Sequence, residues 1–159
     1  MPLPADKKER DAFFDFAARG DAAAIEYLDA IAALVYLADD SVDEDLPFAT
    51  RQDYMLRILW LTLVRLPSNP FHARFGGSMA PLVMEILVFW QKSDEWKQTG
   101  DLKRKLFGFV RRENIDGLVV AVAGIVGGAD HAKAVAERIM ELCHSHGETL
   151  EDWMNEGRP

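Results

Sequence analysis

Three aspartates at the end of an apolar stretch have the spacing best suited to metal chemistry. They are Asp39, Asp40 and Asp43 in the string YLADDSVDED, and they spell D-D-x-x-D. Carboxylate oxygens are the ligands that Mg²⁺ prefers, and a bound Mg²⁺ can polarise the phosphates of a substrate. The same letters also occur at helix ends that face solvent, so the chemistry depends on where these side chains point.

The preceding residues restrict where Asp39 can point. Apolar side chains recur along this segment in steps of three and four residues, the spacing of one buried helix seam, and Asp39 falls in that seam. An ionised aspartate in such a seam needs a basic partner or a cation. The alternatives are a helix that ends at Ala38 and leaves the cluster in solvent, a buried ion pair, or a metal site. We favour the first, because Ser41 and Glu44 have the capping-box spacing of a new turn.

Two further charges are candidates for a buried network with Asp39. Arg57 lies in an otherwise apolar helix predicted over residues 51–65, and its guanidinium can satisfy a carboxylate with two hydrogen bonds. Glu113 projects into the apolar face of a helix predicted over residues 102–126. The ion-pair alternative is therefore a network of Asp39, Arg57 and Glu113.

A possible anion site precedes the next predicted helix, residues 78–96. The string RFGGS places Arg74, Gly76, Gly77 and Ser78 where the free N–H groups of a helix N-terminus would gather. It lacks the G-K-[ST] ending of a phosphate loop. We expect a helix-entry turn capped by Ser78, with the anion site as the alternative.

The string CHSH near the C-terminus offers sulfur and imidazole ligands. Cys143, His144 and His146 have no second ligand pair at zinc spacing, and a histidine at a helix C-terminus is common because it complements the helix dipole. We do not expect a zinc site there.

The elements that must position these residues are helices. Residues that begin and end helices are frequent, and the alternation of apolar and polar residues that is typical of strands is nearly absent, so the sequence predicts an all-α fold. We expect a single domain over residues 1–159, built as a compact bundle of five to seven helices. The helices over 51–65 and 78–96 and the second half of 102–126 are apolar on most of their circumference, which predicts a central position for them. The predicted helices cover residues 5–19, a stretch from 22 toward the acidic cluster, 51–65, 78–96, 102–126 and 130–146, with a short turn at 149–154.

Composition narrows the class of protein. The single cysteine excludes an intramolecular disulfide, and the first residues lack the apolar core of a signal peptide. No predicted helix is an uninterrupted apolar run long enough for a membrane span, so we expect a cytoplasmic protein with no membrane contact. The net charge of −8 argues against general affinity for nucleic acid.

The charges are also unevenly distributed. Residues 1–53 hold 13 acidic and 5 basic side chains, which accounts for the whole net charge of −8. The basic side chains gather instead around residues 97–112. This division suits an electrostatically complementary contact, either between two chains or within one.

Three resemblances accompany these patterns. The string D-D-S-V-D is similar to the aspartate-rich motif of class I isoprenoid synthases, which implies Asp39 and Asp43 as ligands of Mg²⁺ on a diphosphate. The E-x-x-D pairs at 26–29 and 113–116 resemble those of all-helical nucleotide pyrophosphatases. The stretches from 66 to 97 and from 122 to 132 look like small uncharacterised helical proteins of tailed bacteriophages and prophages, which implies no defined activity.

From these observations we expect a non-enzymatic helical protein without a cofactor. It would act through association, either as a homo-oligomer or with a protein partner. The alternative is a magnesium-dependent enzyme acting on a diphosphate, in which Asp39, Asp40 and Asp43 bind the metal and Arg57 or Arg74 meets the phosphates.

Overall fold

The computed structural model describes residues 7–43, 47–111, 115–145 and 150–155. No strand occurs in these ranges, which confirms the all-α class, and the number of helices falls within the predicted five to seven when α3, η1 and α4 are counted as one rod. In chain order the elements are α1 (Lys7–Ala18), α2 (Ala22–Asp43), α3 (Phe48–Trp60), the π-helical turn η1 (Leu61–Arg65), α4 (Leu66–Ser68), α5 (Pro70–Lys97), α6 (Leu102–Arg111), α7 (Ile115–Ser145) and α8 (Leu150–Asn155).

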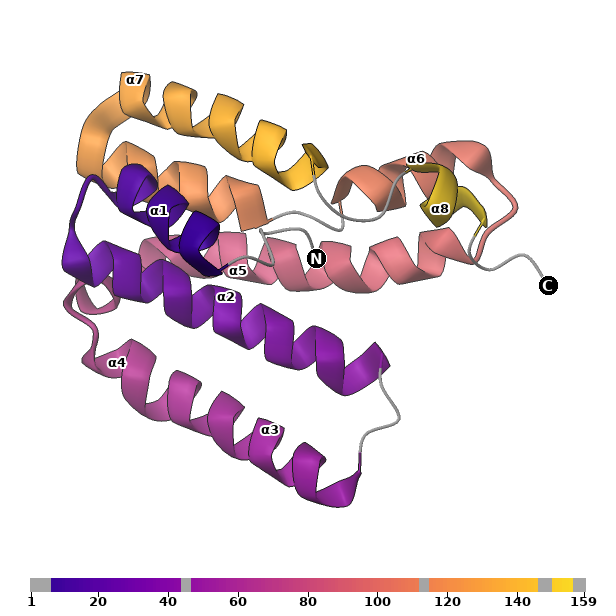
Figure 1. The fold of residues 1–159 in the computed structure, drawn as a ribbon, viewed down its shortest axis with the longest axis horizontal. Coiled ribbons are helices and arrows are strands. Elements are labelled where there is room, and N and C mark those ends of the chain that lie inside the picture. The colour runs from indigo at the N-terminus through magenta and orange to yellow at the C-terminus, as the bar shows by residue number, and fades with distance from the viewer. Residues whose placement is uncertain (1–6, 44–46, 112–114, 146–149, 156–159) are drawn as a thin grey trace.

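The core lies where α1, α2 and α7 pack together (Figure 1). Gly20, at φ 74°, reverses the chain between α1 and α2, and Asp21 caps α2 by accepting a hydrogen bond from the N–H of Ala24 at 3.0 Å. Both features agree with the sequence prediction. The largest side chains that the core buries fully are Phe13, Phe14, Tyr27, Leu28, Ile115, Leu118, Val119, Val122, Val135 and Ile139.

Gly128 divides α7 into two halves that run back along each other (Figure 1). Its φ of 78° is open to glycine and strained for a residue with a Cβ atom, so the predicted break at this glycine pair is confirmed. His131, just past the break, hydrogen-bonds to the carbonyl of Ala17 at 3.1 Å. The second half of α7 is thereby fixed to α1.

Two elements of the structure cover the range of the helix predicted over residues 102–126. These are α6 and the first half of α7, on either side of residues 112–114, which lie outside the described ranges. Figure 1 shows α6 beside the C-terminal half of α5, while α7 lies over α1. The stretch Leu102–Leu142, which includes residues 112–114, is long and apolar enough to cross a membrane by length and composition alone, and 28% of its most apolar part is buried.

The predicted loop before residue 78 is helical, so the N-cap assigned to Ser78 is wrong. Here α5 begins at Pro70, because the side chain of Asn69 accepts a hydrogen bond from the N–H of His72 at 2.9 Å and proline suits the first turn. Gly76 then lies inside the helix with the His72 ring beside it, where a Cβ atom would come within 2.7 Å of the ring. The glycine here allows close packing and does not end a helix.

The central position predicted for residues 51–65 is also wrong. Together α3, η1 and α4 form one rod, which we call the α3 rod, and it lies at the edge of the molecule with one side against α2 (Figure 1). Leu61 and Leu66 are buried on that side. Most of the remaining apolar circumference of the rod is exposed, because no other described element of the chain covers it.

Candidate functional site

The helix α2 does not end before the acidic cluster. Because α2 continues through Asp43, the favoured alternative of a helix that ends at Ala38 is wrong. The Ser41 hydroxyl donates to the carbonyl of Leu37, four residues earlier, as a serine inside a helix does. Asp39 is half-buried, and its Oδ1 accepts a hydrogen bond from the indole Nε1 of Trp90 at 3.1 Å. A neutral donor on α5 thus contacts the carboxylate.

In the structure, Arg57 does not contact Asp39. The Arg57 guanidinium is exposed, and its Nε lies 2.7 Å from Oδ2 of Asp53, one turn earlier on α3. The i, i+4 spacing made that closer partner available on the same helix. Glu113 lies outside the described residues. A buried ion pair between Arg57 and Asp39 is therefore wrong.

The metal ligands of the alternative hypothesis are only partly described. Asp39 and Asp40 are half-buried on α2, whereas the side chain of Asp43 lies outside the described set, as do those of Cys143, His144 and His146. Within the described set, no group of three or more His, Cys, Asp or Glu side chains could hold a metal ion.

The anion site at Arg74, Gly76, Gly77 and Ser78 is wrong for the same reason as the Ser78 cap. These residues lie within α5, where backbone N–H groups bond to the preceding turn and cannot gather around an anion. The Arg74 guanidinium lies over the ring of Phe75, 4.9 Å from its centre.

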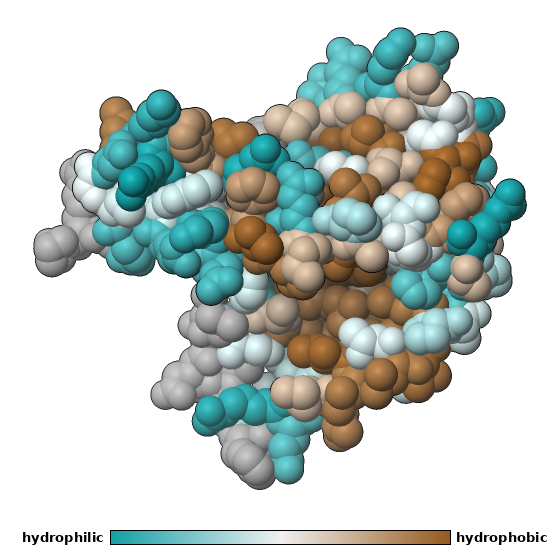
Figure 2. Space-filling view, turned by 180° about the vertical axis from the view of Figure 1, so that it is seen from behind, coloured by the Kyte–Doolittle hydropathy of each residue, from teal (hydrophilic) through white to brown (hydrophobic). Residues whose placement is uncertain are grey.

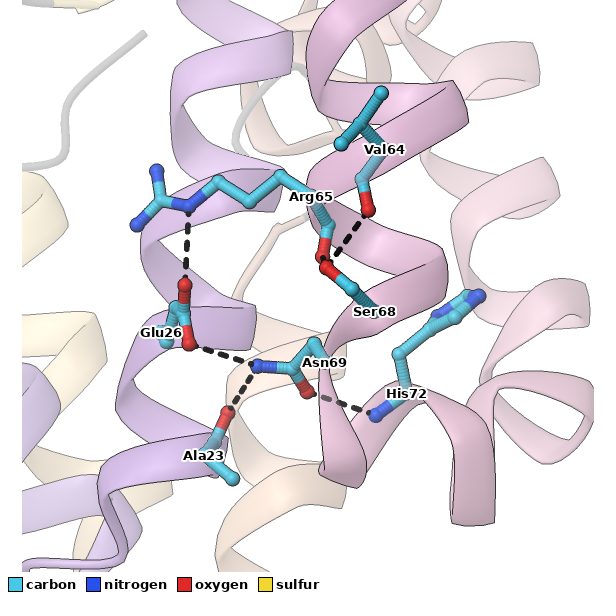
Figure 3. Close-up of polar contacts among 7 residues, drawn as sticks. All are labelled: Ala23, Glu26, Val64, Arg65, Ser68, Asn69 and His72. Carbon is cyan, nitrogen blue, oxygen red and sulfur yellow. Dashed lines mark hydrogen bonds and ion pairs between the residues drawn. The ribbon is translucent and has the colours of Figure 1, made fainter.

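A polar cluster that the sequence did not reveal joins α2 to the α3 rod (Figure 3). The Asn69 side chain is 3% exposed, and its Nδ2 donates to the carbonyl of Ala23 at 2.9 Å and to Glu26 Oε2 at 3.4 Å. Glu26 Oε1 also lies 3.3 Å from Nε of Arg65. Glu26, the first residue of one E-x-x-D pair, thus joins α2 to the rod. The signal for this cluster was the Asn-Pro pair, a common N-cap followed by a common first residue of a helix.

The α3 rod carries the most extensive apolar surface. Six of its large side chains expose between 44% and 69% of their area. We estimate that they cover on the order of 600 Å², the upper end of the roughly 300 to 600 Å² of the largest patch on an ordinary monomer. We call these six side chains the rod surface: Met55, Leu56, Leu59, Trp60, Leu63 and Val64.

The π-helical turn explains how one rod has both a buried and an exposed apolar side. The N–H of Leu66 bonds to the carbonyl of Leu61, five residues earlier, so the turn is wider than in an α-helix. Both leucines of this pair are buried toward the body of the molecule, and Leu63 and Val64 between them are exposed. Apolar side chains therefore continue around the helix onto its outer side.

An apolar groove lies beside the rod surface, with α2 as its floor and the α3 rod and α5 as its walls. Its volume is about 330 Å³, and Figure 2 shows brown side chains around a hollow in this region. The polar groups that line it already have partners, since the Thr62 hydroxyl donates to the carbonyl of Ile58 at 2.8 Å and the Trp90 indole donates to Asp39. The lining consists of Ile31, Leu34, Val35, Ala38, Ile58, Thr62, Val83, Ile86, Leu87 and Trp90.

The apolar surface continues beyond the groove onto α5 and recurs on α6. Met84, Leu87 and Val88 are exposed on α5, next to the groove wall. On α6 four large side chains are exposed, and basic residues lie among them. These four side chains, which we call the α6 stripe, are Leu102, Leu106, Phe107 and Val110.

Comparisons with known proteins add no family to this description. No protein-family model and no curated protein matches the sequence, and no solved structure matches the fold. The function must therefore be argued from the surfaces of the chain itself.

Proposed function

We propose that this chain is a non-enzymatic helical protein that acts through association with copies of itself. The observation that carries the proposal is the rod surface, six large apolar side chains exposed side by side along one helix. A patch of this kind on a water-soluble domain is typical of an interface with another protein.

The extent of the surface supports a stable contact. Together with Met84, Leu87 and Val88 on α5, the rod surface exposes on the order of 900 Å² of apolar side chain, against the roughly 800 Å² that each partner buries in a standard interface. Trp60 and Met55 belong to the residue types that are enriched at such interfaces. Covering these side chains would remove them from water, which is the main favourable contribution to association.

The charges support association between like copies. The end of α2 carries the half-buried Asp39 and Asp40, and the sequence between Arg19 and Arg51 contains no lysine or arginine. The exposed residues of α6 include Lys103 and Arg104. One copy thus presents both an acidic and a basic surface, so two copies can approach with complementary charge.

The test is the mass of the full chain in solution, measured by light scattering. Replacing Leu56 and Leu63, exposed by 65% and 69%, with glutamate places charge on the rod surface without opening the core, so the oligomer should dissociate to single chains. Met140→Glu makes the same change at an exposed side chain of α7 and should leave the oligomer intact. An oligomer that survives both leucine substitutions would contradict this use of the rod surface.

A further inference from the structure

The α6 helix has an apolar side that the described chain leaves uncovered. Leu102, Leu106 and Val110 recur every four residues, and all three are exposed. The side turned toward the rest of the molecule contains Lys105 and Gly108, both buried. An amphipathic helix normally buries its apolar side, so this orientation leaves a helix face available to a partner.

The groove beside the rod has a length similar to that of the apolar side of α6. The apolar anchors from Leu102 to Val110 extend about 12 Å along α6, at 1.5 Å per residue, and the groove floor from Ile31 to Ala38 extends about 10 Å along α2. An apolar groove that accepts side chains at i, i+4 and i+8 is a recurring mode of helix recognition. Because the polar groups of the lining are already hydrogen-bonded, the groove favours an apolar guest.

The charges near the two surfaces are opposite. Asp39 accepts the hydrogen bond of Trp90, a groove residue, and Asp40 follows it on α2, so the end of the groove is acidic. The described residues of α6 include no acid, and its exposed bases are Lys103, Arg104 and Arg111. Two of these bases already form exposed ion pairs, Arg104 with Asp101 and Arg111 with Glu85. Exposed ion pairs contribute little free energy, so replacing them with pairs to another chain costs little.

The groove and α6 of one chain lie on different sides of α5. Arg111 on α6 pairs with Glu85 at 3.3 Å and lies over the Phe89 ring, whereas Val83, Ile86 and Leu87 of α5 line the groove. Packed as it is, α6 cannot enter the groove of its own chain. A second copy supplies the same helix without unpacking it.

We propose that α6 of one copy docks in the groove formed by α2, the α3 rod and α5 of the next copy. The proposal rests on the proposed function and adds a second contact, in the groove beside the rod surface. The contact joins two different surfaces, so each copy offers one helix and one groove, and assembly continues into a ring or an open chain. The α6 stripe fills the apolar groove, and the bases of α6 lie over the acidic end of α2.

Two classes of variant separate the two halves of the contact. Leu106→Glu with Val110→Glu disables the helix, and Thr62→Arg disables the groove, in each case at exposed side chains. Ala38→Phe fills the groove without adding charge and provides a second groove variant. Each variant alone should have the mass of one chain, with affinity weakened by at least about tenfold. Met140→Glu should assemble like the unmodified chain.

The decisive measurement is the mass of a mixture of the helix variant and the groove variant. The intact α6 of one can enter only the intact groove of the other, so an equimolar mixture should form a dimer and nothing larger. Thermal unfolding followed by circular dichroism checks that each variant is folded. A mixture of folded variants that stays monomeric overturns the proposal.

The outcomes also separate this proposal from the proposed function. If the unmodified chain assembles, and if glutamate at Leu56 and Leu63 abolishes assembly while the α6 variants do not, the rod surface remains the interface and the docking of α6 is wrong. If the unmodified chain is monomeric at every concentration, both proposals are wrong.

Discussion

The indole N–H of Trp90 donates a hydrogen bond to Oδ1 of Asp39 across 3.1 Å and 51 positions of sequence. Asp39 lies near the end of α2, and Trp90 lies on α5 in the lining of the apolar groove. The bond therefore joins the floor of the groove to its α5 wall at the acidic end. It is one of the contacts of this half-buried carboxylate, which Arg57 does not reach.

Removing the acceptor should lower the stability of the fold. Asp39→Ala leaves the half-buried Trp90 N–H without this acceptor, at a cost of about 1 to 2 kcal/mol in the free energy of unfolding. Asp39→Asn keeps an acceptor oxygen and should cost less than Asp39→Ala. Denaturant unfolding of both variants, with Asp40→Ala as the matched control, measures the difference. Equal losses for Asp39→Ala and Asp40→Ala would show that the bond contributes nothing.

Asn69 should be among the most sensitive polar positions. Its side chain caps α5 and also donates to the carbonyl of the half-buried Ala23 in the first turn of α2, so Asn69→Ala removes an N-cap and leaves a carbonyl without this donor. We expect a loss of about 2 to 3 kcal/mol. Ser68→Ala, at an exposed hydroxyl one residue earlier, should cost less than about 0.5 kcal/mol. The thermal midpoints of the two variants test this ranking, and similar midpoints would contradict it.

Alkaline pH should destabilise the fold through Tyr27. Burial raises the pKa of Tyr27 from 10.0 to about 12, because the phenolate would lose its hydration in the core. The folded state therefore binds this proton more tightly than the unfolded chain. The resulting stability is fully present below pH 10 and is lost between pH 10 and 12, on the order of 2 kcal/mol. Tyr27→Phe should remove this part of the pH dependence, and an unchanged slope in the variant would assign it to other groups.

Mg²⁺ and pyrophosphate should not stabilise the protein. Oδ1 of Asp39 accepts the Trp90 N–H, and Arg57 pairs with Asp53, so the described ligands and counter-charges of the diphosphate hypothesis are not arranged around one site. A ligand that binds the folded state raises the melting temperature, and a tighter ligand raises it further at the same concentration. We expect no rise with Mg²⁺ and pyrophosphate together. A rise that Asp39→Asn abolishes would instead favour the magnesium-dependent enzyme.

The sequence predicted the turns that depend on a few adjacent residues. Gly20 and Asp21 reverse the chain and cap α2 as expected, and Gly128 breaks α7 at the predicted pair. The same local reasoning failed at Gly76, where glycine makes room for the His72 ring, and at Gly77, which lies inside the same helix with nothing within 4 Å of its Cβ position. A glycine that ends a helix and a glycine that permits close packing have the same letter, and only the tertiary contact distinguishes them.

The candidate site was harder to predict, because it depends on contacts between distant segments. The partner of Asp39 lies 51 positions away on another helix, and no periodicity within α2 identifies it. The apolar circumference of residues 51–65 indicated that this helix must be covered. It did not indicate whether the residues that cover this helix belong to the same chain, and our expectation that they do was wrong.

The most direct test of the central claim is the mass of the unmodified chain in solution. Light scattering over a wide concentration range should give a mass above that of one chain, rising with concentration. Added sulfate should strengthen the apolar part of the contact, and sodium chloride should weaken its charged part. A mass equal to one chain at every concentration and in every salt would contradict association through these surfaces.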